Sequence, residues 1–241
     1  DGLEAGTNHG RAADKYVYSA SVVNQWLEKP STQLKNKKIV FVTFDDGPTT
    51  KFTGEQLDNL EKAGARATFF MIPPQMRDVG KNLLSRSLKM GNALAIHSYS
   101  HDYKYLYHGR AADKAKHIGC DWDWAMAQSR AILGSNYFSS AFRYPGGHMS
   151  WTNLSQADAA LAKRGVGWID WNAMSGDADA QRPTTVPGYL QMVKKSIKES
   201  NNPNVVVILN HDTYGKQMTA KAMPSILAWL KSQGYEFGVI A

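Results

Sequence analysis

From Lys38 to the C-terminus, short apolar segments rich in β-branched and aromatic residues alternate with longer segments of helical periodicity. The apolar segments have the length of strands, and turn-forming or polar residues follow them. Such alternation predicts a mostly parallel sheet with helices outside it, because a parallel crossover needs a helix-length connection. We therefore expect an α/β protein with about seven strands, built as a barrel or as an open doubly wound sheet.

The expected elements divide the chain into regular units. Strands are expected at residues 38–43, 67–72, 93–96, 139–142, 166–169, 205–209 and 236–240. Helices are expected at residues 53–63, 79–89, 113–133, 150–164, 188–199 and 219–232. Residues 1–36 are polar and mixed, and we expect them to form an extension that packs on a domain made by residues 37–241. A short helix within this extension is expected to end at Pro30.

Composition narrows the class of protein. The 241 residues are enough for one large domain with a sizeable core. The net charge of +7 favours acidic surroundings, but the basic residues are spread along the chain, so we expect no nucleic-acid partner. We find no run of about 18 apolar residues and expect no membrane span. Cys120 is the only cysteine, which excludes an internal disulfide and a thiolate metal cluster.

Residues suited to chemistry follow one expected strand after another. They are Asp45, Asp46, His97, Arg143, Asp170 and His211. In parallel α/β folds, the loops at the carboxyl ends of the strands form the site. We therefore expect these side chains to converge, although each one taken alone is equally compatible with a structural role.

Two of these groups suggest a metal. Asp45 and Asp46 end the first expected strand, and two neighbouring carboxylates repel each other unless a cation lies between them. The same residues, followed by Gly-Pro, are also good turn formers. His97 and His101 are four residues apart, which on a helical turn places both imidazoles on one face. With one of the carboxylates they would form a site that suits zinc or another divalent transition metal.

The remaining polar residues suggest acid–base chemistry. Arg143 precedes Tyr-Pro-Gly-Gly, and an arginine can hold a carboxylate through two hydrogen bonds while glycines let the backbone approach a ligand. A surface turn with a charged flank is the alternative. Asp170 and His211 are a possible pair in which the carboxylate raises the pKa of the imidazole, as a general acid requires. An ordinary buried ion pair is the alternative here.

Five short motifs occur in a fixed order along the chain. They are Thr43-Phe-Asp-Asp-Gly-Pro48, His97-Ser-Tyr-Ser-His101, Arg143-Tyr-Pro-Gly-Gly147, Asp170-Trp171 and Leu209-Asn-His211. Together they resemble the five motifs of the polysaccharide deacetylases, the NodB-homology domains of carbohydrate esterase family 4. The resemblance covers about residues 38–241 and implies a deformed (β/α) barrel.

The resemblance implies a role for each motif. Asp46, His97 and His101 resemble the family's metal triad, for which Zn²⁺ is the preferred divalent ion and Co²⁺ a substitute. Asp45 resembles the general base, and Arg143 would hold its carboxylate. The metal would polarise the acetyl carbonyl, and the base would take a proton from the attacking water.

The resemblance also implies how the reaction would end. A backbone N–H at Gly146 would help to stabilise the tetrahedral oxyanion. His211 resembles the general acid that protonates the leaving amine, and Asp170 would tune its pKa. The products would be acetate and a free amino sugar.

The third motif departs from the common family pattern. Many family members carry tyrosine where this chain has Gly146, so the pocket loses a side chain at that point. We expect Tyr144, Trp171 and Leu209 to bind substrate beside Gly146. Trp171 and Leu209 match the family's apolar wall around the acetyl methyl group, and both are equally compatible with the core.

The implied substrate is a glycan polymer or oligomer that contains N-acetylglucosamine. The Pro-Gly-Gly form of the third motif, followed by Trp151, resembles the peptidoglycan deacetylases of Gram-positive bacteria, so peptidoglycan is preferred. Chitin, its oligomers and acetylxylan are alternatives for the same chemistry, and a non-catalytic glycan-binding module is an alternative of another class. The family implies a secreted or envelope-associated protein, which we expect to be a monomer.

Overall fold

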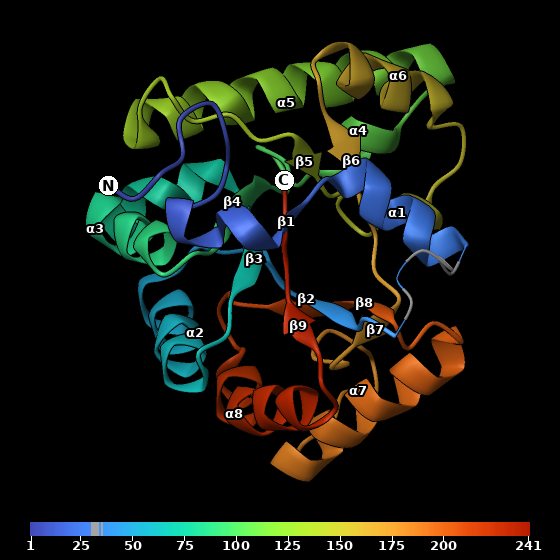
Figure 1. Ribbon diagram of the computed structural model, residues 1–241. Coiled ribbons are helices and arrows are strands. Elements are labelled where there is room, and N and C mark those ends of the chain that lie inside the picture. Colours follow the sequence, from blue (N-terminus) through green and yellow to red (C-terminus); the bar gives the residue numbers. More distant parts are fainter. Residues whose placement is uncertain (30–33, 35) are drawn as a thin grey trace.

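The protein is described by a computed structural model that covers residues 1–29, 34 and 36–241, so the expected helix end at Pro30 lies outside the described residues. Seven parallel strands follow one another around an incomplete barrel in the order β6-β5-β4-β3-β2-β8-β7 (Figure 1). Their bounds are β2 Ile39–Asp45, β3 Ala67–Met71, β4 Ala93–Ile96, β5 Ala141–Phe142, β6 Gly167–Trp168, β7 Ala173–Met174 and β8 Val205–His211. A further short strand, β9 (Glu236–Phe237), pairs with the start of β2. The expected α/β class and barrel are confirmed.

Helices form a ring around the strands (Figure 1). The longer ones are α2 Thr50–Ala63, α3 Met76–Lys89, α5 Ala111–Leu133, α6 Ser155–Lys163, α7 Val186–Ser200 and α8 Gln217–Ser232. Helix α2 ends where the sequence predicts. Its C-terminal cap is Gly64, in the left-handed conformation that glycine adopts without strain.

Two apolar layers follow from the alternation of side chains along the strands. In β2, Ile39 and Phe41 belong to a cluster inside the barrel, whereas Val40 and Val42 belong to the larger cluster that the outer helices cover. Asp45 has the same parity as Ile39 and Phe41, so its side chain faces the inside of the barrel at the carboxyl end of the strand. The mouth of the barrel is therefore where polar side chains can gather.

The described N-terminal residues pack against this domain. Strand β1 (Val17–Tyr18) pairs in parallel with β10 (Val239–Ile240), and the Asn8 side-chain amide donates a hydrogen bond of 3.1 Å to the Ile240 carbonyl. A 3₁₀ turn (Arg11–Tyr16) precedes β1. Helix α1 (Ala20–Glu28) follows and contacts β6 and β8, near the two ends of the strand series (Figure 1).

Three differences from the expected elements affect the site. The aromatic segment after His101 contains a short helix, α4 (Tyr103–Tyr107), capped by the Asp102 side chain. Strand β7 lies in a segment expected to be a loop, and β5 and β6 have only two residues each.

Among the described residues, none of the helices combines the length and apolar character that a bilayer crossing requires.

Candidate active site

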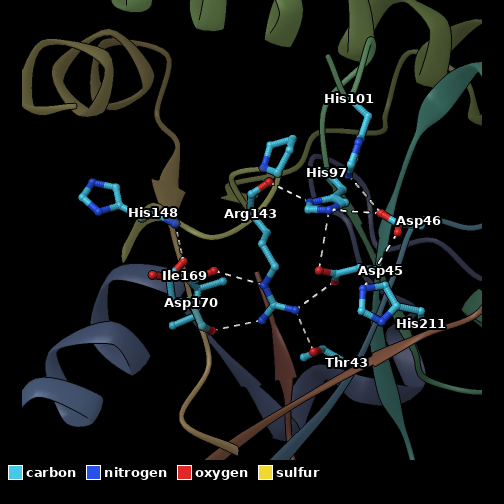
Figure 2. A network of polar contacts seen from close by, with 12 residues as sticks. Thr43, Asp45, Asp46, His97, His101, Arg143, His148, Ile169, Asp170 and His211 are labelled. Atoms are coloured by element: carbon cyan, nitrogen blue, oxygen red, sulfur yellow. Dashed lines mark hydrogen bonds and ion pairs between the residues drawn. The ribbon is translucent and has the colours of Figure 1, made fainter. Parts of the chain in front are cut away.

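Neighbouring strands deliver the functional side chains to the barrel mouth. Asp45 and His211 are direct register partners on β2 and β8. Ile96 and Phe142 pair on β4 and β5, so His97 and Arg143 each follow one residue beyond a paired position. Four residues that are far apart in sequence thus meet at one end of the barrel (Figure 2).

Arg143 is fully buried and holds Asp45. One terminal nitrogen donates to Asp45 Oδ1 at 2.9 Å and to Thr43 Oγ1 at 2.7 Å. The other guanidinium nitrogens donate to the carbonyls of Ile169 and Asp170, at 3.2 and 3.0 Å (Figure 2). A buried charge is tolerated when it is paired and hydrogen-bonded, and here the charge of Arg143 balances that of Asp45. The second Asp45 oxygen, Oδ2, lies 3.6 Å from His97 Nε2.

Asp46 lies between two imidazoles. Its Oδ1 is 3.3 Å from His97 Nε2 and 3.2 Å from His101 Nε2 (Figure 2). Asp46 has a φ of 75°, which turns the chain so that it contacts the same imidazole as Asp45. This turn after β2 therefore brings both carboxylates to one place.

These three residues suit a metal ion. Each offers one ligand atom, and the three atoms lie within 4.8 Å of one another. His97 Nδ1 bonds the Arg143 carbonyl at 2.9 Å, which fixes Nδ1–H and leaves the lone pair on Nε2, facing Asp46. Two imidazole nitrogens and one carboxylate oxygen are a donor set that zinc and similar divalent metals accept.

The charge of Asp46 agrees with this placement. Burial by itself raises the pKa of this carboxyl, but its close contacts with His101 and His97 and the positive charges of His97 and His211 outweigh burial, so the pKa lies well below its usual range. Burial lowers the pKa of His101, and the close contact with the Asp46 carboxylate and its charge outweigh that effect and raise it. Asp46 is thus an anion that needs a positive partner, which protons on the imidazoles or a cation can supply.

The predicted helical turn between the two histidines is wrong. His97 to Asp102 form an irregular loop, in which Ser98 has a φ of 92° and His101 a φ of 47°. The His101 N–H donates to Ser98 Oγ at 2.9 Å. This loop, rather than helical spacing, brings the two imidazoles together.

The loop is held from outside by Asp121. This residue is buried on α5 and accepts hydrogen bonds from Tyr99 N at 2.8 Å, Ser100 N at 2.9 Å and Ser100 Oγ at 2.6 Å. Sequence reasoning did not find Asp121, because it lies mid-helix in a segment that carries no motif.

The predicted pairing of Asp170 with His211 is also wrong, because Asp177 is the partner. His211 Nδ1 lies 2.8 Å from Asp177 Oδ1, and the His211 backbone N–H donates to Asp177 Oδ2 at 2.9 Å. The Thr219 hydroxyl donates to the same oxygen at 2.9 Å. These contacts orient His211 so that Nε2 faces the site, 3.8 Å from Asp46 Oδ2.

The surroundings of His211 favour its protonated form. Burial lowers the pKa of the imidazole, but the hydrogen bond and charge of Asp177, with the charges of Asp45 and Asp46, outweigh burial and raise it to about 9. A histidine with this pKa carries its proton at neutral pH and can act as a general acid.

Asp170 misses His211 because of strand parity. Ile169 belongs to the cluster inside the barrel, so the Asp170 side chain points the other way. Its carboxylate accepts a hydrogen bond of 2.8 Å from the backbone N–H of His148 (Figure 2) and one of 2.9 Å from that of Met149. Asp170 therefore holds the loop that follows the third motif.

The residues expected to bind substrate also differ in whether their side chains can reach the site. Tyr144 has the opposite parity to Arg143, is fully buried and donates to Asp158 Oδ1 at 2.7 Å, so its expected contact with substrate is wrong. Gly146, Trp171 and Leu209 are each partly exposed. A Cβ on Gly147 would lie 2.7 Å from Trp171 Cη2, so the second glycine permits close packing of this loop on the indole.

Sequence reasoning missed Asp177 for a reason that the fold explains. Strand β7 is two residues long and pairs with β8, and the chain continues from its end to Asp177. A two-residue strand leaves almost no periodic pattern, and only the Gly176-Asp177 turn marked the position.

The barrel mouth combines a carboxylate paired with arginine, a triad able to bind a metal and an imidazole with a raised pKa. These are the kinds of group that metal-assisted hydrolases use. The family model for polysaccharide deacetylase matches residues 32–164, more than half of the chain. The chain therefore belongs to the polysaccharide deacetylase family.

Individual relatives agree with this assignment. A carbohydrate esterase family 4 esterase of Streptococcus mutans superposes with a TM-score of 0.89 and 39% identity, over 99% of this chain and 98% of the other. A peptidoglycan-N-acetylglucosamine deacetylase of Bacillus cereus is 28% identical over 84% of this chain and 69% of the relative. A bifunctional xylanase/deacetylase of Pseudobutyrivibrio xylanivorans is 30% identical over 87% of this chain, but the match spans only 31% of that longer protein.

Proposed function

We propose that this protein removes the acetyl group from N-acetylglucosamine residues of a glycan, preferably peptidoglycan, and releases acetate. One observation carries the proposal: the Asp46–His97–His101 triad, the Asp45–Arg143 pair and the His211–Asp177 pair meet at one end of the barrel.

The triad is proposed to hold Zn²⁺, with Co²⁺ as a substitute. When bound, such an ion supplies Lewis-acid chemistry toward the acetyl carbonyl and the attacking water. The remaining steps belong to side chains and backbone groups of this chain.

Asp45 is the proposed general base. Its Oδ1 accepts from Arg143, while its Oδ2 lies on the side of His97 and can accept a proton from water. Arg143 holds the carboxylate in one orientation through a hydrogen bond of 2.9 Å between opposite charges.

Gly146 is the proposed oxyanion donor. The water oxygen bonds to the acetyl carbon, and the carbonyl oxygen takes the negative charge. Among the described residues the Gly146 N–H donates no hydrogen bond to the protein, so it remains free to donate to this oxygen. A donor that is already in place stabilises the charge at little cost in reorganisation.

His211 is the proposed general acid. The bond between acetyl carbon and sugar nitrogen breaks, and His211 Nε2 gives its proton to the nitrogen, which leaves as the amine. An amine is a poor leaving group unless it is protonated, so the raised pKa of His211, about 9, suits an amide substrate. The immediate products are the free amine and acetic acid, which loses its remaining proton to solvent and leaves as acetate. Exchange with solvent then removes the proton from Asp45 and returns one to His211, so both groups regain their starting states.

The choice of glycan rests on the relatives and on charge. The Bacillus cereus relative is a peptidoglycan-N-acetylglucosamine deacetylase, and a net charge of +7 suits an acidic cell wall. We accordingly propose that the protein acts at the cell envelope, as a monomer. The Pseudobutyrivibrio relative, a bifunctional xylanase/deacetylase, makes acetylated xylan the second candidate.

A direct comparison of substrates tests this choice. Acetate release would be measured on peptidoglycan, N-acetylglucosamine oligomers and acetylated xylan, with zinc-loaded wild type and with His211→Ala. We expect release from the two amide substrates, and a loss of about 10²–10⁴-fold in the variant, because a positioned general acid contributes about that much. Release from xylan alone would make the protein an esterase, and binding without release from any substrate would make it a glycan-binding module.

A further inference from the structure

We propose that Tyr103 contacts the sugar ring that carries the acetyl group, and that it forms the wall of the substrate site above Gly146. The inference rests on the glycan deacetylase function proposed above and extends it to a residue outside the five motifs.

Helix α4 places Tyr103 beside the metal triad. The helix begins two residues after His101, and its cap, Asp102, accepts from Lys104 N at 2.9 Å and Tyr105 N at 3.2 Å. The Tyr103 ring centroid lies 5.6 Å from that of His101. The side chain is therefore anchored by a capped turn next to a triad ligand.

The hydroxyl of Tyr103 reaches across to the third motif. A Cβ added to Gly146 would lie 3.2 Å from the Tyr103 hydroxyl oxygen and 3.3 Å from Trp151 Nε1. The rings of Tyr103 and Trp151 meet edge to face, with centroids 5.1 Å apart. Tyr103 thus occupies the space that a side chain at position 146 would take, over the peptide whose N–H is proposed to bind the oxyanion.

Hydrogen bonds and stacking hold the aromatic residues around Tyr103 in place, but the hydroxyl of Tyr103 itself is not held in this way. Tyr107 and Trp151 stack with centroids 3.9 Å apart, and both donate to the Pro145 carbonyl, at 2.7 and 3.0 Å. Within the described part of the chain, the Tyr103 hydroxyl forms no hydrogen bond to the protein, and the residue is 46% exposed. A rigid aromatic support therefore presents one exposed ring and one free hydroxyl.

This arrangement suits an acetylated pyranose. A sugar that offers its acetyl group to the triad and to Gly146 comes close to the Tyr103 side chain, because this side chain adjoins both His101 and Gly146. Tyrosine combines an apolar ring, able to pack on the C–H face of a pyranose, with a hydroxyl that can bond to a sugar hydroxyl. An acetyl compound without a sugar would make none of these contacts.

The test compares two substrates in zinc-loaded protein. Wild type, Tyr103→Phe and Tyr103→Ala would be assayed on an N-acetylglucosamine tetramer and on 4-methylumbelliferyl acetate, which has an acetyl group and no sugar. Tyr105→Phe is the matched control, because Tyr105 lies on the same helix but stacks on His117, with centroids 4.5 Å apart. Thermal unfolding would confirm that each variant is folded.

We expect Tyr103→Ala to lower kcat/KM on the tetramer by at least about tenfold, mainly through KM, and Tyr103→Phe by about threefold, since a lost hydrogen bond to a ligand has roughly this effect. Both variants should keep kcat/KM on the sugar-free acetate within about twofold, and Tyr105→Phe should match wild type on both. Equal losses on both substrates, or no loss on the tetramer, would overturn the proposal.

A binding measurement separates this inference from the proposed function. The tetramer would be titrated into Asp45→Asn, with and without Tyr103→Ala, and followed by tryptophan fluorescence, since Trp151 adjoins Tyr103. If wild type released no acetate but Tyr103→Ala weakened tetramer binding, the Tyr103 contact would stand and the deacetylase function would fall. Binding unchanged by Tyr103→Ala, or no binding at all, would overturn the Tyr103 contact.

Discussion

Asp45 and Asp46 are neighbours in the sequence, yet their carboxylates contact different partners. Asp45 is tied to the buried Arg143, whereas Asp46 lies between His97 and His101. The positive φ of Asp46 makes this division possible, because it turns the chain between two residues that a regular strand would send to opposite faces. One carboxylate is thereby left for proton transfer and the other for a metal.

The assignment of Asp177 as the partner of His211 predicts a specific pH effect. His211 acts as an acid only while protonated, so kcat/KM should fall as pH rises through its raised pKa of about 9. Asp177→Asn removes the charge that raises this pKa, and the alkaline limb should move to lower pH. Asp170→Asn is the matched control and should leave the limb in place, because Asp170 bonds His148 and Met149. A limb that moved in Asp170→Asn and not in Asp177→Asn would restore the pairing expected from sequence.

A second prediction concerns Gly147. Its φ is 89°, and a Cβ there would lie 2.7 Å from Trp171 Cη2. Its ψ is 141°, so Gly147 lies in a region of positive φ that residues with a Cβ rarely adopt. Gly147→Ala should lower the free energy of unfolding by more than the roughly 1–3 kcal/mol that such a sparsely populated conformation costs. Gly234→Ala provides the control, because Gly234 has a φ of 81° and open space around it. Equal losses in urea unfolding of the two variants would show that the contact with Trp171 has no energetic weight.

At the scale of elements, α5 holds the loop from His97 to Asp102, which carries both histidines of the triad, through one side chain. Asp121 accepts three hydrogen bonds from Tyr99 and Ser100, between the two histidines of the triad. Asp121→Asn puts a donor where two N–H groups and a hydroxyl need an acceptor, so it should weaken zinc binding by about 10–100-fold, as changes to residues that orient metal ligands do.

Competition with a chelator of known affinity measures this effect. Asp123→Asn is the matched control two residues further along α5, where the side chain is exposed and pairs with Arg164. If the two variants bound zinc equally well, the loop would hold its shape without Asp121.

The sequence predicted the long elements and most of the site, and it failed where periodicity is short. Asp45, Asp46, His97 and His211 converge as expected, because each follows or ends a strand of at least four residues with a clear apolar pattern. Arg143 joins them although β5 has only two residues. Asp170 and Tyr144 were misplaced because they sit one residue from an inward-facing position, and a shift of one residue reverses the face. Asp177 and Asp121 follow from tertiary contacts that no local pattern encodes.

At the scale of the whole molecule, the described N-terminal residues behave as part of the domain. Leu3 is 4% exposed within the main apolar cluster, and β1 pairs with the last strand of the chain. We propose that this segment is an extension whose packing contributes to the stability of the entire barrel.

Leu3→Ala tests this proposal. It should lower the free energy of unfolding by about 2–5 kcal/mol, as for other buried leucines, and the protein should still unfold in one transition. Val22→Ala is the control, since Val22 lies in the same segment but is 39% exposed, and it should cost well under 1 kcal/mol. If Leu3→Ala left the unfolding of the barrel unchanged, or produced a separate early transition, the segment would be independent of the domain.

The central claim is that a metal held by Asp46, His97 and His101 works together with Asp45 as the base. The most direct measurement is acetate release from an N-acetylglucosamine oligomer before and after chelation, with zinc or cobalt added back, in wild type and in Asp45→Asn. The account predicts that activity is lost on chelation and returns with metal, and that Asp45→Asn binds zinc normally but releases acetate about 10²–10⁴-fold more slowly. Acetate release that persists in the metal-stripped protein, or that Asp45→Asn retains in full, would contradict it.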